Sequence, residues 1–183
     1  MKHQVLFIQG GGDDGYNADK TMVQSLRDNL GKEYKVIYPE LNSDESAPDF
    51  GWISQIENHL YNLNSEIILV AHSLGASMLL KSLSENSIEI KSKGIFLIAT
   101  PYWSGDEDWK KGLKLVKDFS KKLPKDLPVY LYHSRDDEEV PFGQFEEYKK
   151  RLPDAIFKEL EKGGHQLNND LSIVAKDIKK SLK

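Results

Sequence analysis

Short runs of hydrophobic residues recur along the chain, and segments whose hydrophobic residues return every third or fourth position separate them. The runs are rich in Val, Ile, Leu and Phe and cover residues 4–9, 34–38, 66–71, 94–99, 129–133 and 155–160. Their hydrophobic residues are continuous more often than alternating, which is typical of strands covered on both faces. The pattern therefore predicts six strands that are mainly parallel.

Five amphipathic segments lie between these runs, and a sixth follows the last one. The clearest helical faces are Met22, Val23, Leu26 and Leu30; Ile53, Ile56, Leu60 and Leu63; Trp109, Leu113, Val116 and Leu123; and Leu171, Val174, Ile178 and Leu182. Gly31 is a typical helix stop, and Ser104 with Glu107 forms a capping box ahead of the third face. Such regular alternation predicts a single three-layer α/β domain over residues 1–183, an open, mainly parallel six-stranded sheet with helices on both faces.

A serine lies where the third predicted strand gives way to a helix, in the segment LVAHSLGAS at residues 69–77. A tight strand-to-helix turn exposes the Ser73 hydroxyl above the sheet and leaves room only for small residues two positions away on either side. Gly75 meets this demand, and Ala71 departs from it by one methyl group. A helix N-cap is the other common role for such a serine. We interpret Ser73 as a nucleophile because suitable partners follow later in the chain.

Two later loops carry those partners. Asp136 and Asp137 follow the fifth strand in HSRDDEEVP, and His165 follows the sixth in EKGGHQLN. The carboxyl ends of parallel strands meet at one edge of a sheet, so these loops are expected to converge with Ser73. A serine nucleophile needs a base to take its proton and a carboxylate to orient that base. We predict Asp137 as this acid, with Asp136 as the alternative.

The other four histidines fit the role of base less well than His165, which lies on a glycine-flanked loop. His3 precedes a strand at the opposite edge, and His59 belongs to a surface helix. His133 ends a strand, where a buried and hydrogen-bonded side chain is expected. The turn at Ser73 is expected to direct the His72 side chain away from the hydroxyl.

The loop after the first strand, FIQGGGDDGYN, contains a formal G-x-G-x-x-G. A dinucleotide would place its pyrophosphate beside Asp13 and Asp14, and the helical pattern begins only near Ala18, past the third glycine. We therefore predict no organic cofactor, and no metal, because no later glutamate completes a calcium ligand set. Acyl transfer needs backbone N–H donors for an oxyanion, and we predict those of Leu74 and Gly11, with Gly12 as the nearby alternative to Gly11.

Tyr102, Trp103 and Trp109 follow the fourth strand. They lie beside the expected site, where they would wall an acyl pocket or form a small lid. Covering the seam between a helix and the sheet is the common alternative for such aromatic residues. The sequence leaves both roles open.

Composition narrows the range of partners. The 183 residues carry a net charge of −4 and no cysteine, which excludes disulfides, thiolate metal sites and a cysteine nucleophile. An acidic chain is a poor match for nucleic acid. No apolar stretch reaches the roughly 18 residues of a membrane span, and the N-terminal run 5–8 is too short for a signal peptide, so we expect a cytoplasmic protein.

With QGGGDDG, AHSLG, DDEEVP and GGH, essentially the whole chain resembles a small, nearly lid-less member of the α/β-hydrolase superfamily. It is similar to the retinoblastoma-binding-protein-9 group of serine hydrolases and its bacterial YdeN-like relatives. The resemblance implies a six-stranded sheet without the two leading strands of the superfamily, and a triad of Ser73, Asp137 and His165.

The expected activity is hydrolysis of small carboxylic esters or related acyl substrates through an acyl-enzyme intermediate. A hydrolase-shaped protein-binding module with little or no turnover is the alternative, because one member of that group is named for a protein partner.

Overall fold

A computed structural model of the chain describes residues 2–12, 14–63, 66–86, 90–105, 110–125 and 127–182. All six predicted strands are confirmed, with ends that differ from the predicted ones by no more than two residues. The strands are β1 (His3–Ile8), β2 (Tyr34–Ile37), β3 (Ile67–His72), β4 (Ser92–Ile98), β5 (Val129–Ser134) and β6 (Ile156–Leu160).

The six strands form one sheet in the order β2-β1-β3-β4-β5-β6, and every neighbouring pair is parallel. The central strands are in register at their carboxyl ends, where Ala71 pairs with Ile8 on one side and Leu97 on the other. The loops after β1, β3, β5 and β6 therefore leave from the same edge. The predicted fold class is confirmed.

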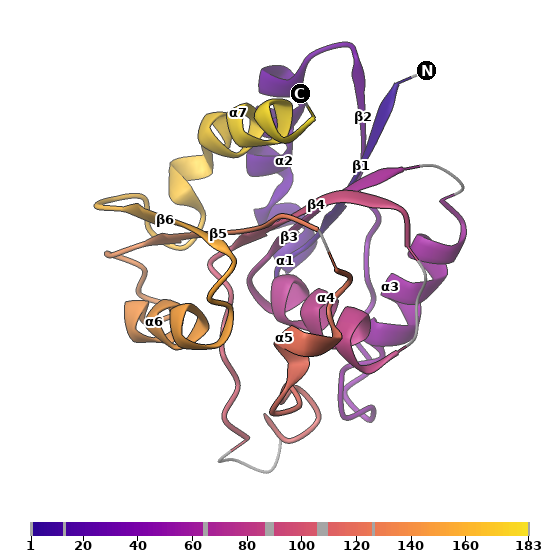
Figure 1. Ribbon diagram of the computed structural model, residues 1–183, viewed down its shortest axis with the longest axis vertical. Helices are drawn as coiled ribbons and strands as arrows, with labels where there is room; N and C mark the ends of the chain where they lie inside the picture. Colours follow the sequence, from indigo (N-terminus) through magenta and orange to yellow (C-terminus); the bar gives the residue numbers. More distant parts are fainter. Residues whose placement is uncertain are drawn as a thin grey trace.

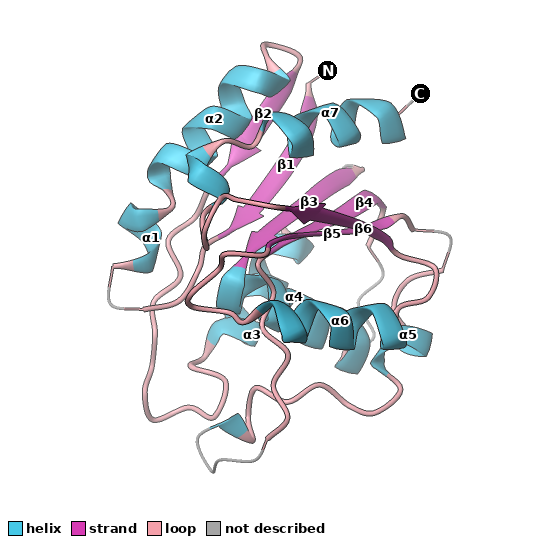
Figure 2. Cartoon of the chain, turned by 90° about the vertical axis from the view of Figure 1, so that its left-hand side faces the viewer, coloured by secondary structure: helices cyan, strands magenta, loops and turns pink. Residues whose placement is uncertain are grey.

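Helices cover both faces of the sheet, which gives three layers (Figures 1 and 2). On one face lie α2 (Lys20–Leu30) and α7 (Ser172–Ser181); on the other lie α3 (Trp52–Tyr61), α4 (Ser73–Glu85), α5 (Phe119–Lys122) and α6 (Phe142–Arg151). Two hydrophobic cores result, one on each side of the sheet. The short α1 (Gly15–Ala18) and the 3-10 turn η2 (Leu167–Asn169) belong to loops at the carboxyl edge.

The helix predicted across residues 109–123 was wrong for most of its length. Among the described residues of this segment, an α-helix is present only in the single turn α5, and residues 111–118 form turns and irregular backbone. Leu113 and Leu115 are both buried at a spacing of two, and the Lys114 carbonyl accepts a hydrogen bond from the Lys81 ammonium at 2.8 Å. Tertiary contacts thus hold this segment in a conformation that its hydrophobic spacing did not reveal. Glu107 and Trp109, part of the predicted capping box and helical face, lie outside the described residues.

Candidate active site

Ser73 lies at the turn between β3 and α4. His72 is the last residue of the strand and has an extended backbone, and Ser73 begins the helix with a φ of 50°. A positive φ in a residue other than glycine costs roughly 1–3 kcal/mol and persists only where the surrounding structure enforces it. The chain reverses direction within one residue here, and the half-buried Ser73 borders a cavity of about 820 Å³.

Position 75 requires glycine for a steric reason. A Cβ on Gly75 would lie 2.1 Å from the Gln9 carbonyl oxygen and 2.7 Å from the Ile8 Cγ2, so no larger residue fits. Ala71 occupies a different environment, because it is fully buried inside β3 and pairs with strand residues on both sides. The one-methyl departure from the usual motif therefore lies in the sheet, where the methyl is part of the hydrophobic core.

The structure brings His165 and Asp137 together. The His165 Nδ1 is 3.1 Å from Asp137 Oδ1 and 3.0 Å from Oδ2, and Oδ1 also accepts the backbone N–H groups of Glu139 and Val140 at 2.9 Å each. Burial alone would raise the pKa of the Asp137 carboxyl, but the hydrogen bonds from His165, Val140 and Glu139 outweigh it and leave the pKa below its ordinary value. Asp137 is therefore ionised at neutral pH.

Ser73 and His165 line the same cavity. No hydrogen bond joins the Ser73 hydroxyl to the His165 ring among the contacts of the described residues. Nucleophile–base hydrogen bonds are often long before substrate binds, so this geometry is compatible with a triad. Residues from seven separate segments of the chain enclose the rest of the cavity: Gly10, Gly11, Gly12, Gly15, Ala18, Asp19, Phe50, His72, Leu74, Pro101, Trp103, Leu113, Glu139, Val140, Gly163, Gln166, Asn168 and Asn169.

Asp136, the alternative acid, contacts the backbone of the histidine loop instead of the ring. Its Oδ1 accepts the N–H groups of Gly163 at 2.9 Å and Gly164 at 2.8 Å, and the Ser134 hydroxyl also donates to it. The Ser134 hydroxyl and the Gly164 N–H hold the pKa of Asp136 below its ordinary value. The two adjacent carboxylates thus bind different parts of the same loop. Asp137 contacts the His165 ring, and Asp136 contacts the backbone of the turn that precedes His165.

Gly11 and Leu74, the residues predicted to supply the oxyanion donors, pack against each other. A Cβ on Gly11 would be 2.8 Å from the Leu74 Cδ2, so the glycine loop packs closely against the start of α4. Both residues line the cavity. The N–H of Leu74 belongs to the first turn of α4, where backbone donors lack partners within the helix. The same loop corrects one prediction, because α1 begins at Gly15 and not near Ala18.

Two other histidines are buried near the site. His133 was expected to be buried and hydrogen-bonded; its Nε2 lies 2.8 Å from the Val140 carbonyl oxygen, and burial lowers its pKa. The His72 ring bonds Asp19 through Nδ1 and the backbone carbonyl of His165 through Nε2. Sequence reasoning missed Asp19, which resembles a helix N-cap in DKTM but makes no side-chain cap hydrogen bond and is 1% exposed.

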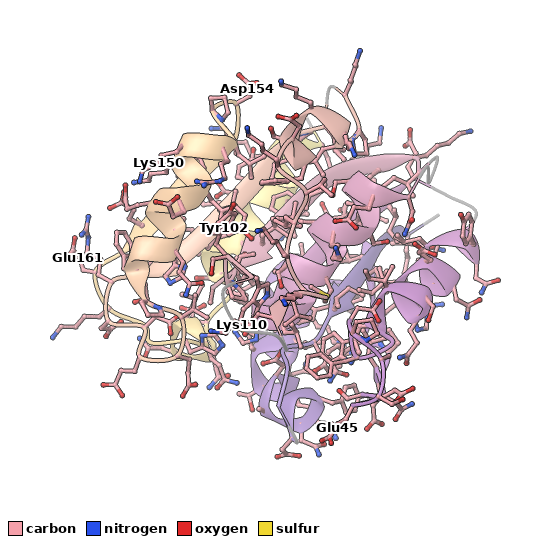
Figure 3. All side chains as sticks on the ribbon, turned by 90° about the horizontal axis from the view of Figure 1, so that it is seen from below. Glu45, Tyr102, Lys110, Lys150, Asp154 and Glu161 are labelled. Atoms are coloured by element: carbon pink, nitrogen blue, oxygen red, sulfur yellow. The ribbon has the colours of Figure 1, made fainter. Side chains whose placement is uncertain are left out.

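The aromatic residues after β4 take different roles. Tyr102 lies between α4 and α6 (Figure 3), where it contacts the Tyr148 ring edge-on and accepts the Arg151 guanidinium over its face. Tyr102 therefore packs against α6 and is not among the residues that line the cavity. Trp103 lines the cavity, with its Nε1 donating to the Ser77 hydroxyl at 3.0 Å. Trp109 lies outside the described residues.

Two kinds of feature are absent from the described part of the chain. Within it, no three or more His, Asp or Glu side chains gather in a way that could hold a metal ion. None of its helices combines the length and the apolar character that crossing a membrane requires.

The fold is that of a small α/β-hydrolase. Among solved structures, the chain is similar to the ydeN gene product from B. subtilis, with 18% identity and a TM-score of 0.74 over 100% of this chain and 99% of that one. Est1E from Butyrivibrio proteoclasticus is 15% identical with a TM-score of 0.73, over 99% and 87% of the two chains. The carbazole-degradation serine hydrolase CarC is 14% identical with a TM-score of 0.72, over 98% and 90%.

Comparison at the level of sequence gives the family. No curated protein matches the chain. The family model described as serine hydrolase matches residues 23–172, a span that includes Ser73, Asp137 and His165. Because this match covers most of the chain, the protein belongs to the serine hydrolase family.

Proposed function

We propose that the protein hydrolyses small, uncharged carboxylic esters, with Ser73 as nucleophile, His165 as general base and Asp137 as the carboxylate that orients it. One observation carries the proposal. His165, hydrogen-bonded to Asp137, borders the same cavity as a serine held at positive φ on a strand-to-helix turn. This combination is the arrangement from which serine hydrolases build an acyl-enzyme.

The chemistry follows from the hydrogen bonds. Asp137 accepts a hydrogen bond from the Nδ1–H of His165. This leaves Nε2 free to take the Ser73 proton as the hydroxyl oxygen attacks the ester carbonyl carbon. The N–H groups of Leu74 and Gly11 are assigned to the resulting oxyanion. When the tetrahedral intermediate collapses, the ester C–O bond breaks and His165 returns its proton to the departing alcohol. Water then repeats the sequence and releases the carboxylic acid.

The cavity lining favours an uncharged acyl group. Its hydrophobic side chains are Phe50, Leu74, Pro101, Trp103, Leu113 and Val140. No lysine or arginine lines it among the residues that the structure describes, whereas the carboxylate-bearing residues Asp19 and Glu139 do. A substrate carboxylate would lose its hydration here without gaining a cationic partner, which is costly.

Esters that differ only in acyl charge test this preference. We expect kcat/KM for p-nitrophenyl hexanoate to exceed that for mono-p-nitrophenyl adipate by about tenfold or more, the equivalent of about 1.4 kcal/mol. Rates are corrected for the intrinsic reactivity of each ester with hydroxide. Glu139→Gln should narrow the gap, and Glu138→Gln, a change at an exposed neighbour that does not line the cavity, should leave it unchanged. Equal kcat/KM values for the two esters would contradict the proposed preference for an uncharged acyl group.

Covalent labelling tests the nucleophile directly. A fluorophosphonate should react with the purified protein as a phosphorus–oxygen bond forms at Ser73 and fluoride leaves. Fragmentation mass spectrometry must separate Ser73 from Ser77, which lies on the same helix and close to the cavity. We expect the adduct on Ser73, its loss after heat denaturation, and competition by excess ester. A folded protein that takes no label would favour the binding-module alternative over the enzyme.

A further inference from the structure

A second Asp–His pair, Asp19 and His72, lies next to the proposed triad. The Asp19 Oδ2 is 2.9 Å from the His72 Nδ1, and the side chains are 1% and 2% exposed. The proposed reaction uses neither residue. A buried ion pair is weak evidence for stability, because desolvation of both groups offsets their attraction. The location of the Asp19–His72 pair at the candidate active site is therefore more informative than its contribution to stability.

One contact of His72 requires a hydrogen on Nε2. Its Nε2 faces the backbone carbonyl of His165 at 3.1 Å, and a carbonyl oxygen can only accept. Its Nδ1 is hydrogen-bonded to the Asp19 carboxyl group. The pair thereby holds the backbone of His165 in place. The ring centroids of His72 and His165 lie 4.6 Å apart.

Asp19 connects the same point to two other segments. Its Oδ2 also accepts the N–H of Gly10 at 2.7 Å, next to the predicted donor Gly11, and its Oδ1 accepts the Gln166 side-chain amide at 3.2 Å. The fit at Gly10 is tight, because a Cβ there would be 2.8 Å from the His72 Nδ1. One carboxylate therefore joins the oxyanion loop, the residue before the nucleophile and the histidine loop.

We propose that Asp19 and His72 are positioning residues, which hold the Gly10–Gly11 segment and His165 in register with Ser73. This inference rests on the proposed function. Side-chain contacts of Asp19 and His72 join the three segments at the sheet edge. A displacement of about 1 Å in a reacting group can cost about a hundredfold in rate. Loss of the pair is thus expected to act on the chemical step and much less on substrate binding.

Isosteric substitutions separate positioning from folding. In His72→Asn the amide nitrogen can replace Nδ1 toward Asp19, but the donor to the His165 carbonyl is lost. His72→Gln keeps a donor near Nε2 and loses the contact with Asp19. For p-nitrophenyl hexanoate we expect kcat to fall about a hundredfold in His72→Asn and in Asp19→Asn, with KM changed less than threefold. His72→Gln should retain more activity than His72→Asn, and fluorophosphonate labelling rates should fall in the same order.

Asp177→Asn is the matched control. Asp177 is also a buried carboxylate, and it accepts the Tyr132 hydroxyl at 2.9 Å beneath α7, among residues that do not line the cavity. It should lower the melting temperature and leave kcat unchanged. A similar loss of kcat in Asp177→Asn would reduce the Asp19 effect to general destabilisation and overturn the inference. So would folded His72 and Asp19 variants whose kcat stays within threefold of wild type, or in which only KM changes.

A milder variant covers the case in which the buried changes prevent folding. Gln166→Met removes an amide that donates to Asp19 and to the Ala18 carbonyl from a half-exposed position. We expect kcat to fall about threefold to tenfold at unchanged KM, the effect of losing the contact with Asp19. An unchanged kcat would overturn the inference. Absence of label and turnover in the wild-type protein would instead refute the proposed function, so the two failures are distinguishable.

Discussion

Ser73→Ala is expected to lower kcat for p-nitrophenyl ester hydrolysis by about 10⁶-fold, because residues of a triad act as a unit and the nucleophile is removed outright. The fold should be retained. The Ser73 side chain makes no hydrogen bond to the rest of the described structure, and alanine meets the same backbone demand at φ 50° as serine does. Steady-state kinetics and circular dichroism on the same preparation measure both expectations.

Ser82→Ala is the matched control for this prediction. Ser82 lies on the same helix, fully buried, with a hydroxyl that has no hydrogen-bond partner. Its removal should leave kcat unchanged and the free energy of unfolding equal or higher, because an unsatisfied buried hydroxyl is unfavourable. A folded Ser73→Ala protein that kept more than about one thousandth of the wild-type kcat would refute the assignment of the nucleophile.

The strands could be predicted from the sequence because their hydrophobic runs are continuous and bounded by polar or glycine-rich segments. Parallel strands buried on both faces leave this signal in the sequence itself. The edge strand β6 shows how far the signal reaches, since it was found although Ile156 is 40% exposed. Strand order follows from pairing between distant segments, which hydrophobic spacing does not encode.

The convergence of Ser73, Asp137 and His165 could also be predicted, because parallel topology alone brings the ends of β3, β5 and β6 to one edge. The contacts around Asp19 and His72 could not be predicted. They depend on the direction in which the two side chains point, and on Gly10 lying within hydrogen-bonding distance of Asp19. The prediction of a helix across residues 110–118 was wrong for a related reason. Contacts with Pro48 and Lys81 hold this segment in another conformation, although its hydrophobic residues are spaced as in a helix.

Asp137→Asn is expected to lower kcat by about 10⁴-fold with little change in fold. The structure predicts which way the new amide would face. The Glu139 and Val140 N–H groups both donate to Oδ1, so the amide oxygen is held there and the NH₂ group replaces Oδ2. That NH₂ would face the His165 Nδ1 at 3.0 Å. The amide oxygen would remain 3.1 Å from the same nitrogen. Whenever the ring accepts from the NH₂ group at Nδ1, it carries its hydrogen on Nε2, the atom that has to take the Ser73 proton.

Asp136→Asn is the matched control, because the change in charge is the same at the adjacent residue. All three donors to Asp136, from Ser134, Gly163 and Gly164, bind one oxygen, and an amide oxygen can replace it. We expect kcat to stay within about threefold of wild type, because the turn before His165 keeps its hydrogen bonds. The two variants should therefore differ by about a thousandfold or more in kcat. The reverse order would assign the acid to Asp136, since only the residue that sets the tautomer of His165 can produce the larger loss.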